Sequence, residues 1–281
     1  MIALEYDGKL GNQMFEFAFA RTIANRLHTY LAIANTCDLH KYFRSICTHE
    51  NIINNIPYLR TRYRRKIKSL KEAYYIDCSD CRVEPKEQLK KVRDDAYYLG
   101  FFQSVESFDK EGVLSWFRIK RMYRKEFETL LGKEFRNNKT IVAHVRRGDY
   151  LTHGLSIGSK VADVSLPKAY YDACFGQIKD LDNYQIYFIG DDMDYAKEVG
   201  KEYKNVKFIH ETEITDMQLL INADICIISN STFAWWGAYL NRKLNKKVYA
   251  PKYFLGYYEK DEFPKGIYAE TGFSEIEWRE A

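Results

Sequence analysis

The sequence predicts an α/β protein built from two facing Rossmann-like domains, each with a parallel sheet. Short apolar runs alternate with helical stretches through the second half of the 281-residue chain. A strand, a glycine turn and a helix also open the first half. Short runs without polar alternation are typical of parallel strands that are buried on both faces. The runs lie at 141–143, 186–189, 206–209, 225–228 and 248–250.

The first domain is expected to begin with a strand at 2–6 and a turn that contains Gly8 and Gly11. Residues 12–27 then repeat apolar side chains at helical spacing, which predicts a helix. From 35 to 98 the sequence is aromatic and basic with weak periodicity, so no elements are predicted there.

The second domain is expected to place a helix after most of its strands, at 165–178, 214–223 and 231–240. Charged and polar residues cluster near 132–138, which favours a domain boundary there. The predicted domains are therefore 1–135 and 136–281. A last helix is expected to pack back on the first domain.

Composition and charge narrow the class of protein. The chain is 46% hydrophobic and 29% charged, as in globular proteins, with six Cys that fit reduced thiols. No signal segment or membrane-length apolar stretch is visible, so we expect a cytoplasmic protein. The net charge of +4 concentrates between Arg60 and Lys71. A solvated helix face is the first interpretation of this run, and contact with an anionic membrane is the second; no nucleic-acid partner is expected.

The strongest motif, HVRRGDY, begins at His144 directly after the apolar run at 141–143. Ligands bind open α/β sheets at the carboxyl ends of the strands. Arg146 and Arg147 carry planar charged groups that match phosphate oxygens, and Asp149 is expected to orient one of them. A structural salt bridge is the alternative. Two arginines beside one aspartate leave one positive charge uncompensated, which favours an anionic ligand.

A second polar run follows the strand at 225–228, where Ser229, Asn230, Ser231 and Thr232 open the next helix. Unpaired backbone N–H groups at a helix start, together with hydroxyl groups, form a phosphate site that needs no metal. An ordinary N-cap is the alternative, but it explains only one hydroxyl residue.

A third candidate site is the turn that contains Gly8, Gly11, Asn12 and Gln13. Small residues there let a ligand approach the backbone closely. Because the spacing is not that of a dinucleotide fingerprint, the turn indicates a ligand site without naming its ligand.

Asp191, Asp192 and Asp194 follow the strand at 186–189 and allow two interpretations. A carboxylate cluster can hold Mg²⁺ or Mn²⁺ on a nucleotide-sugar diphosphate. One carboxylate can instead accept the ring protons of guanine. Since arginines and a helix start already offer positive charge to a diphosphate, the sequence favours base recognition.

Together these motifs resemble those of bacterial α-1,2-fucosyltransferases of glycosyltransferase family 11. The resemblance covers both halves and rests on GKLGNQMF at 8–15, GFFQS at 100–104, the arginine motif, and the run at 216–240. The chain departs from the family pattern where Lys9 replaces a second glycine and where no histidine lies near Asp224. These departures concern the acceptor and not the diphosphate residues.

The resemblance implies a GT-B-type architecture with an acceptor-side first domain and a GDP-fucose-binding second domain. It further implies no metal cofactor, inversion at the anomeric carbon, and transfer of L-fucose to the 2-hydroxyl of a terminal β-galactoside. Arg146 would contact the β-phosphate, and Ser231 and Thr232 would bind phosphate. His144 and Asp192 would contact guanine.

The remaining candidate site residues are Gly11, Gln13, Arg147 and Asn230, which are expected to bind substrate, and Asn12 and Asp149, which are expected to take part in catalysis. The catalytic base is left open among Asp149, Glu16 and a water linked to Asn12. Three other functions are open as well: a metal-dependent nucleotide-sugar transferase, a fucosyltransferase of different linkage, and a non-catalytic glycan-binding module.

Overall fold

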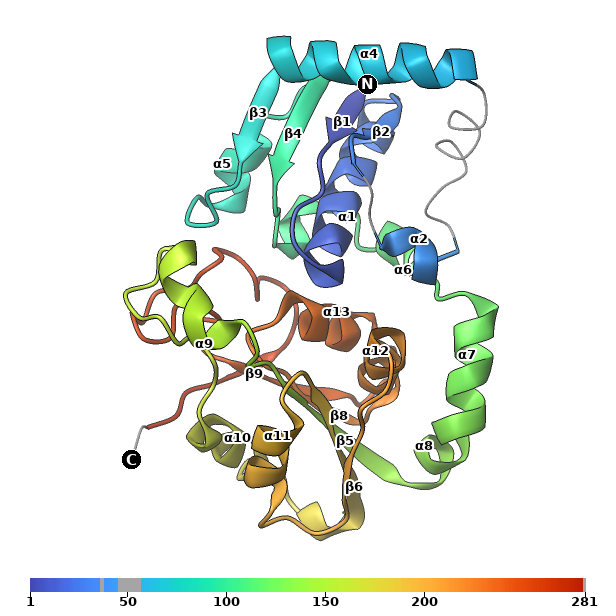
Figure 1. The fold of residues 1–281 in the computed structure, drawn as a ribbon. Coiled ribbons are helices and arrows are strands. Elements are labelled where there is room, and N and C mark those ends of the chain that lie inside the picture. The colour runs from blue at the N-terminus through green and yellow to red at the C-terminus, as the bar shows by residue number, and fades with distance from the viewer. Residues whose placement is uncertain (36–37, 45–56, 280–281) are drawn as a thin grey trace. The chain divides into compact units, whose positions relative to one another are not determined.

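The structure is a computed structural model that describes residues 1–35, 38–44 and 57–279 (Figure 1). The chain forms two compact units. Unit 1 comprises Met1–Lys120 and Pro264–Glu270, and unit 2 comprises Arg121–Phe263 and Thr271–Ala281. Each unit has its own sheet with helices packed on it, so the predicted α/β class is confirmed for both.

Unit 1 is built on a sheet of short parallel strands. Across the sheet the strands are β2 (Leu31–Ile33), β1 (Ile2–Leu4), β4 (Ala96–Gly100) and β3 (Tyr75–Cys78). The helical elements of this unit are α1 (Leu10–Arg26), α2 (Leu39–Tyr42), α4 (Pro57–Ala73), α5 (Pro85–Leu89), η1 (Val105–Ser107) and α6 (Gly112–Trp116). The predicted first strand and helix are confirmed. Strands of three to five residues give too few alternations to show a period, which explains why β2, β3 and β4 were not predicted.

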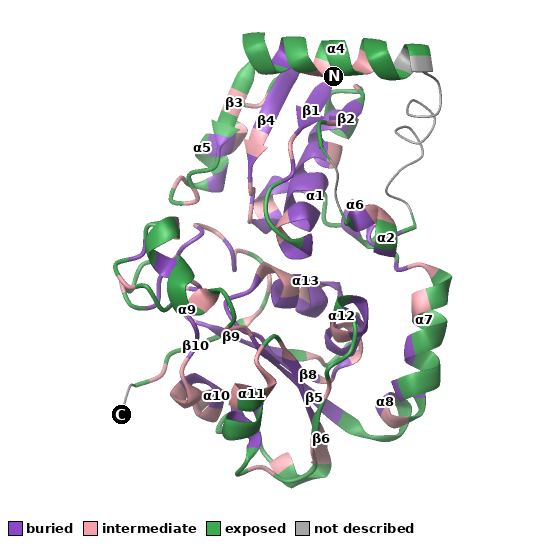
Figure 2. Ribbon diagram, viewed as in Figure 1, coloured by how far each residue is buried: buried purple, intermediate pink, exposed green. Residues whose placement is uncertain are grey.

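Helix α4 packs on the unit 1 sheet through a narrow apolar stripe. Tyr63, Ile67 and Leu70, at helical spacing, lie against Ala3 and Tyr97. The rest of the helix surface is largely exposed and carries the basic run (Figure 2). The run therefore lies on an exposed helix face, which fits the first interpretation and leaves contact with a membrane a prediction.

Unit 2 contains the longer strands, and all of them pair in parallel. Across the sheet they are β10 (Ser274–Ile276), β9 (Lys247–Pro251), β8 (Ile225–Ile227), β5 (Lys139–Val145), β6 (Tyr184–Gly190) and β7 (Val206–Phe208). The helical elements are α7 (Arg121–Phe127), η2 (Glu128–Gly132), α8 (Lys133–Asn137), α9 (Tyr150–His153), η3 (Gly154–Ile157), α10 (Lys168–Phe175), η4 (Leu181–Asn183), α11 (Met193–Gly200), α12 (Glu213–Asn222) and α13 (Thr232–Leu240).

Helices cover both faces of the unit 2 sheet (Figure 1). Helices α10 and α11 bury apolar side chains against β5 and β6. Ala143 of β5 and Phe188 of β6 belong to this core. Helices α12 and α13 lie on the other face, where Trp235 and Trp236 are fully buried. The five predicted strands and three predicted helices of this unit are present. Helix α11 was not predicted because it is short and its buried residues are mostly small.

The division between the units falls before Arg121, earlier than the boundary expected at 135/136. The segment between these positions packs on unit 2. Phe135 lies with its ring 5.0 Å from that of Tyr187, whose hydroxyl donates to the Glu134 carboxylate over 2.6 Å. The cluster of polar residues that suggested a boundary is therefore the exposed side of α8.

The carboxyl-terminal part of the chain also differs from expectation. The segment Pro264–Glu270 belongs to unit 1, where the Lys265 N–H donates to the Cys81 carbonyl over 2.9 Å. Within 264–279 the structure has no helix; residues 274–276 instead form strand β10 beside β9. The expected return to the first domain is present, but a loop makes it.

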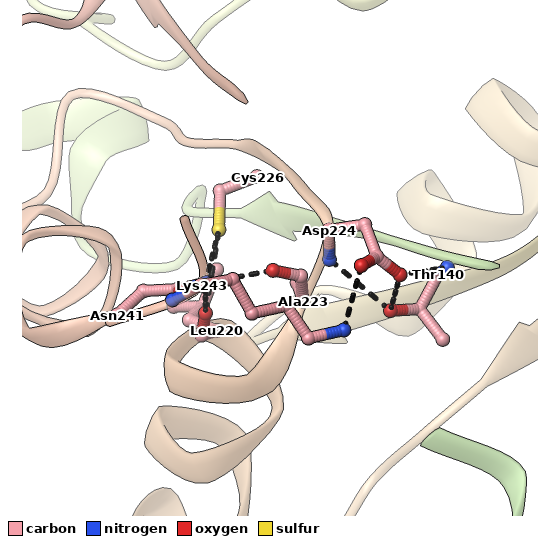
Figure 3. Close-up of polar contacts among 7 residues, drawn as sticks. All are labelled: Thr140, Leu220, Ala223, Asp224, Cys226, Asn241 and Lys243. Carbon is pink, nitrogen blue, oxygen red and sulfur yellow. Dashed lines mark hydrogen bonds and ion pairs between the residues drawn. The ribbon is translucent and has the colours of Figure 1, made fainter. Parts of the chain in front are cut away.

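A polar cluster closes the amino edge of the unit 2 sheet (Figure 3). Asp224, just before β8, accepts hydrogen bonds from the Thr140 N–H and the Lys243 ammonium, both at 2.7 Å. The buried Asn241 amide donates to the carbonyls of Leu220 and Ala223 at 2.9 and 2.7 Å. The departure from the family pattern near Asp224 therefore falls in a structural cluster, at the edge opposite the carboxyl ends of the strands.

Replacing Asn241 by Ala should lower the free energy of unfolding by about 2 to 4 kcal/mol, because two buried carbonyls lose their donor. The matched change Lys243→Ala removes a partly exposed ion pair and should cost less than about 1 kcal/mol. Urea denaturation of both variants measures the difference. Equal losses would show that the Asn241 hydrogen bonds are not what stabilises this edge.

Candidate functional site

The predicted phosphate-type motifs of unit 2 come together at one edge of its sheet. Strands β8, β5 and β6 are neighbours in that order and run in parallel. Their carboxyl ends therefore place Ser229, Arg146 and Asp191 next to one another. This is the edge at which open α/β sheets bind ligands.

Gly190 brings the ends of β5 and β6 into close contact. Its φ of +139° is rarely adopted by other residues, and a Cβ atom there would lie 1.8 Å from the Val145 carbonyl oxygen. The Asp191 N–H donates to that same carbonyl over 3.3 Å. The glycine therefore lets the Asp191 side chain reach the residues that follow β5.

Arg146 lies between two carboxylates. Its guanidinium donates to Asp191 over 2.5 Å and to Asp149, and it sits 5.0 Å from the centre of the Tyr150 ring. The Tyr150 hydroxyl in turn donates to the Asn230 carbonyl over 3.1 Å. This arginine is thus held from several sides, with only 17% of its side chain exposed.

Arg147 is held by different partners. Its guanidinium lies 4.2 Å from the centre of the Tyr195 ring and 3.6 Å from an Asp192 oxygen. Its backbone N–H donates to Asp191 over 2.7 Å. The two arginines are therefore adjacent in sequence but oriented by separate sets of side chains.

The charge count that favoured an anionic ligand was wrong. The sequence set two arginines against Asp149 alone, whereas the structure adds Asp191 and Asp192 from the end of β6. The positive charges are therefore fully compensated in the unliganded protein. An anion that binds the Arg146 guanidinium must compete with these carboxylates for its charge.

His144 is buried and neutral beneath the arginines. Burial, followed by the positive charge of Arg146, lowers its pKa from 6.5 to about 3. Its Nδ1 lies 2.8 Å from the Ser229 hydroxyl, and its ring is 5.8 Å from that of Phe233. Only 4% of the residue is exposed, so it can offer a ligand at most its outer edge.

Helix α13 begins at this edge with Ser231 as its N-cap residue. The Ser231 side chain makes no capping hydrogen bond and is 6% exposed. The first N–H groups of an α-helix have no partner within the helix, so an anion is favoured there. Thr232 is the first residue of the helix. The expected arrangement of a strand end and a helix start is confirmed; phosphate binding stays a prediction.

Asn230 has a structural contact instead of an exposed position. Its amide donates to the Val164 carbonyl over 2.7 Å, and the side chain is fully buried. This bond ties the end of β8 to the segment that follows the arginine motif. A direct contact between Asn230 and a ligand stays a prediction.

The acidic run after β6 is not gathered around a common point. Asp191 binds the arginines, Asp192 caps α11 by accepting from the Tyr195 N–H over 2.9 Å, and Asp194 pairs with Lys197 at 3.0 Å. Across residues 1–35, 38–44 and 57–279, no group of three or more His, Cys, Asp or Glu could hold a metal ion. The geometry thus gives the alternative of a metal site at 191–194 no support.

The glycine turn of unit 1 is fixed by Gln13. The Gln13 amide donates to the Gly8 carbonyl over 3.0 Å, and its oxygen accepts from the Asp38 N–H over 2.8 Å. Asn12 accepts from the Gln103 amide over 3.0 Å, while Gly11 is buried in the first turn of α1. Gln13 therefore supports the turn, and only 6% of it is exposed to a ligand.

Two buried carboxyl groups hold protons at neutral pH. Burial raises the pKa of Glu16, on α1, to about 9 and that of Asp216, on α12, to about 8. Each has an oxygen without a hydrogen-bond partner in the described part of the chain. Asp216 was missed by the sequence analysis. Its protonation depends first on burial and then on the charges of Glu211 and Glu213, and no sequence motif shows that this side chain is buried.

The exposed face of α4 carries Arg60, Arg62, Arg64 and Arg65, and these four have no ion-pair partner among the described residues. Contact with an anionic membrane through this face stays a prediction, which flotation with anionic and neutral vesicles would test. Within the described ranges, none of the helices combines the length and apolar character required to cross a bilayer.

Comparison with known proteins identifies the class. A family model described as glycosyl transferase family 11 matches residues 1–266. The chain belongs to this family and is therefore a glycosyltransferase.

Two curated relatives come from Escherichia coli. The chain is 27% identical to the O-antigen biosynthesis glycosyltransferase WbnK, over 89% of this chain and 93% of that protein. It is 26% identical to an alpha-1,2-colitosyltransferase, over 83% of this chain and 85% of that protein. The chain thus resembles these bacterial enzymes over nearly its whole length.

Solved structures of fucosyltransferases share the fold. POFUT1 in complex with GDP-fucose superposes with a TM-score of 0.55 at 11% identity, covering 89% of this chain and 97% of that one. Fucosyltransferase NodZ from Bradyrhizobium superposes with a TM-score of 0.51 at 13% identity, covering 85% and 92%. The predicted GT-B-type fold, with one Rossmann-like unit in each half, is therefore confirmed.

The raised pKa of Glu16 predicts how pH affects stability. The folded protein keeps this proton up to about pH 9, whereas the unfolded chain loses it near pH 4.5. The stabilisation is complete below pH 4.5 and is lost as the pH rises, by up to about 1.4 kcal/mol per pH unit. Glu16→Gln should lack this loss, so its stability relative to the parent should increase from pH 5 to pH 8.

Urea denaturation of Glu16→Gln and the parent at both pH values measures this effect. Glu111→Gln, at an exposed position of unit 1, is the matched control and should follow the parent. A constant difference between Glu16→Gln and the parent would mean that Glu16 is ionised in the folded protein.

Proposed function

We propose that the protein transfers L-fucose from GDP-β-L-fucose to the 2-hydroxyl of a terminal β-galactoside, with inversion and without a metal. One observation carries the proposal: Arg146 and the start of α13 lie at the same sheet edge in a family 11 glycosyltransferase. The GDP and GDP-fucose complexes among structures of this fold support the donor. The relative named for α-1,2 transfer supports the linkage.

Guanine is read by Asp192 and His144 in this proposal. One Asp192 oxygen accepts from the cap of α11, and the other lies 3.6 Å from the Arg147 guanidinium. This second oxygen accepts the base protons beside that arginine. His144 is neutral, so it adds a hydrogen bond to the base without adding a positive charge beside Arg146. The arrangement selects GDP over UDP or ADP, because those bases lack the paired donors of guanine.

The diphosphate binds between Arg146 and the first turn of α13. Cleavage of the fucose C1–O bond leaves negative charge on the β-phosphate, and prepositioned donors stabilise that charge most effectively. Asp191 keeps the Arg146 guanidinium in place from one side. Asp149, with 47% of its side chain exposed, is the carboxylate that the phosphate replaces. Ser231, Thr232 and Arg147 supply the neighbouring contacts.

The acceptor hydroxyl attacks from the face opposite the departing phosphate, which inverts the anomeric carbon. Its proton must pass to a base late in the step. Glu16 is protonated up to about pH 9 in the free protein, so this carboxyl group is poorly suited to the role. Asp149, with 47% of its side chain exposed, separates from Arg146 when phosphate binds that arginine, which makes it the better candidate. Asn12 is left to position the acceptor or a water.

The same contacts support the proposal that no metal is needed. Asp191, Asp192 and Asp194 are engaged by arginines, a helix cap and a lysine, so the diphosphate charge falls to Arg146 and the helix start.

Purified protein should transfer fucose from GDP-fucose to a terminal β-galactoside, with EDTA present, and the product linkage should be α-1,2 by NMR. The protein should also bind GDP more tightly than UDP in calorimetry. Activity lost in EDTA and restored by Mn²⁺ would contradict metal independence, and another linkage would contradict the acceptor hydroxyl. An activated colitose belongs in the donor panel, because one relative is a colitosyltransferase.

Arg146→Lys should reduce kcat/KM for GDP-fucose by at least about 100-fold, the order expected when one prepositioned donor is lost. Lysine keeps the charge but cannot bind Asp191 and phosphate at once through a planar fork. Arg136→Lys, an exposed ion pair elsewhere in unit 2, is the control and should retain activity. A folded Arg146→Lys protein within a few-fold of the parent would show that this arginine is structural, and Arg147→Lys would then identify the alternative.

A further inference from the structure

A cavity of about 770 Å³ lies at the carboxyl ends of β9 and β10, beyond the residues assigned above. It is lined by aromatic and basic side chains that come from the segment after β9 and from the last described residues of the chain. In Figure 1 these are the orange and red segments that follow β9 and that lead to the carboxyl terminus. No step of the proposed transfer uses this cavity.

The aromatic side chains of the cavity pack against one another and against the core of unit 2. Tyr257 is buried, and its hydroxyl donates to the Ser165 carbonyl over 2.8 Å. The Trp278 ring lies 5.0 Å from the Tyr257 ring and 5.2 Å from that of Tyr170, a core residue. The Tyr258 ring lies 4.1 Å from the Tyr257 ring, tilted by 35°, and the residue is 43% exposed. Ring faces held in this way suit the C–H faces of a sugar.

The charged side of the cavity has an excess of positive charge. Lys252 pairs with Glu277 at 2.9 Å, which neutralises one lysine. Lys260 and Arg279 also line the cavity, and neither has an ion-pair partner in the part of the chain that the structure describes. Two positive charges therefore remain beside the aromatic side chains, which favours a ligand with negative charge.

The cavity is connected to the proposed donor site through the segment that follows the arginine motif. Glu259 accepts a hydrogen bond from the Lys160 N–H over 2.7 Å, and the Val164 N–H donates to the Tyr150 carbonyl over 2.9 Å. Strand β10 lies three strand spacings from β5, so the two sites are roughly 14 Å apart along the same sheet edge. An oligosaccharide of a few residues spans such a distance.

We propose that this cavity binds an anionic saccharide: a sugar ring that stacks on Tyr258 and Trp278 while its carboxylate or phosphate meets Lys260 and Arg279. The binding itself stands on the cavity alone. Its use as a subsite for the distal part of a long, charged acceptor rests on the proposed function.

The test is a titration followed by NMR, with GDP held at saturation so that anions do not enter the donor site. The probes are methyl β-glucuronide, galactose 1-phosphate and neutral methyl β-galactoside. The Trp278 indole N–H signal, assigned by its loss in Trp278→Phe, reports on this cavity. At least one anionic probe should shift it with about 10-fold higher affinity than the neutral probe. The stronger of the two shows whether carboxylate or phosphate is preferred.

Lys260→Glu should abolish the preference for anions, and Tyr258→Ala should weaken the binding of the preferred probe. The matched control is Lys201→Glu, at an exposed lysine that directly follows α11. This variant should behave as the parent. Equal affinity for all three probes would overturn the proposal. A preference for anions that survives Lys260→Glu would also overturn it. So would a preference that Lys201→Glu removes as fully as Lys260→Glu does, because the preference would then reflect the net charge of the protein alone.

The two proposals fail separately. Anionic probes that bind as expected while no fucose is transferred would leave the cavity assigned and remove the proposed donor chemistry. Fucose transfer with no selective binding at Trp278 would leave the transferase and remove the subsite.

Discussion

One carboxylate, that of Asp191, fixes the position of both arginines in the site. Its two oxygens accept from the Arg146 guanidinium and from the Arg147 backbone N–H. The contact exists because Gly190 pairs with Val145 in the register of β5 and β6. A side chain at position 190 would collide with the Val145 carbonyl oxygen. The guanidinium is thus positioned by the pairing of two central strands, which is among the most rigid features of the fold.

This construction also determines how the site handles charge. Arginines that already pair with carboxylates attract further anions less strongly, because their positive charge is compensated. Selection then depends on how well a ligand reproduces the geometry of Asp149 at Arg146 while also reaching the start of α13. Under the proposed function, the diphosphate of the donor has enough oxygens to do both, whereas a small single anion does not.

Much of the fold could be predicted from the sequence because unit 2 is regular. Its strands are buried on both faces and therefore appear as uninterrupted apolar runs, and the arginine motif follows one of them directly. The short strands β2, β3 and β4 of unit 1 gave no such pattern. Strand β10 was also missed, since Ser274 and Glu275 are exposed and only its end meets the core.

The sequence predicted which motifs of unit 2 meet at one sheet edge, but it did not predict their electrostatics. Arg146 and Asp191 are separated by 45 positions, so no local pattern links them, and the charge count failed for that reason. The protonation of Glu16 and Asp216 depends on burial by residues distant in sequence. Properties that arise from pairs of distant residues need the folded chain, whereas properties of a strand and the turn after it do not.

The loop Pro264–Glu270 has a consequence for the ancestry of the fold. The chain leaves unit 2, contributes this loop to unit 1, where Gly266 packs against Pro85, and then returns to form β10. Neither half is a continuous stretch of sequence, so a crossover between two genes near Lys120 would exchange one half together with part of the other. A chimaera joined there would combine the Pro264–Glu270 loop of one parent with the rest of unit 1 from the other.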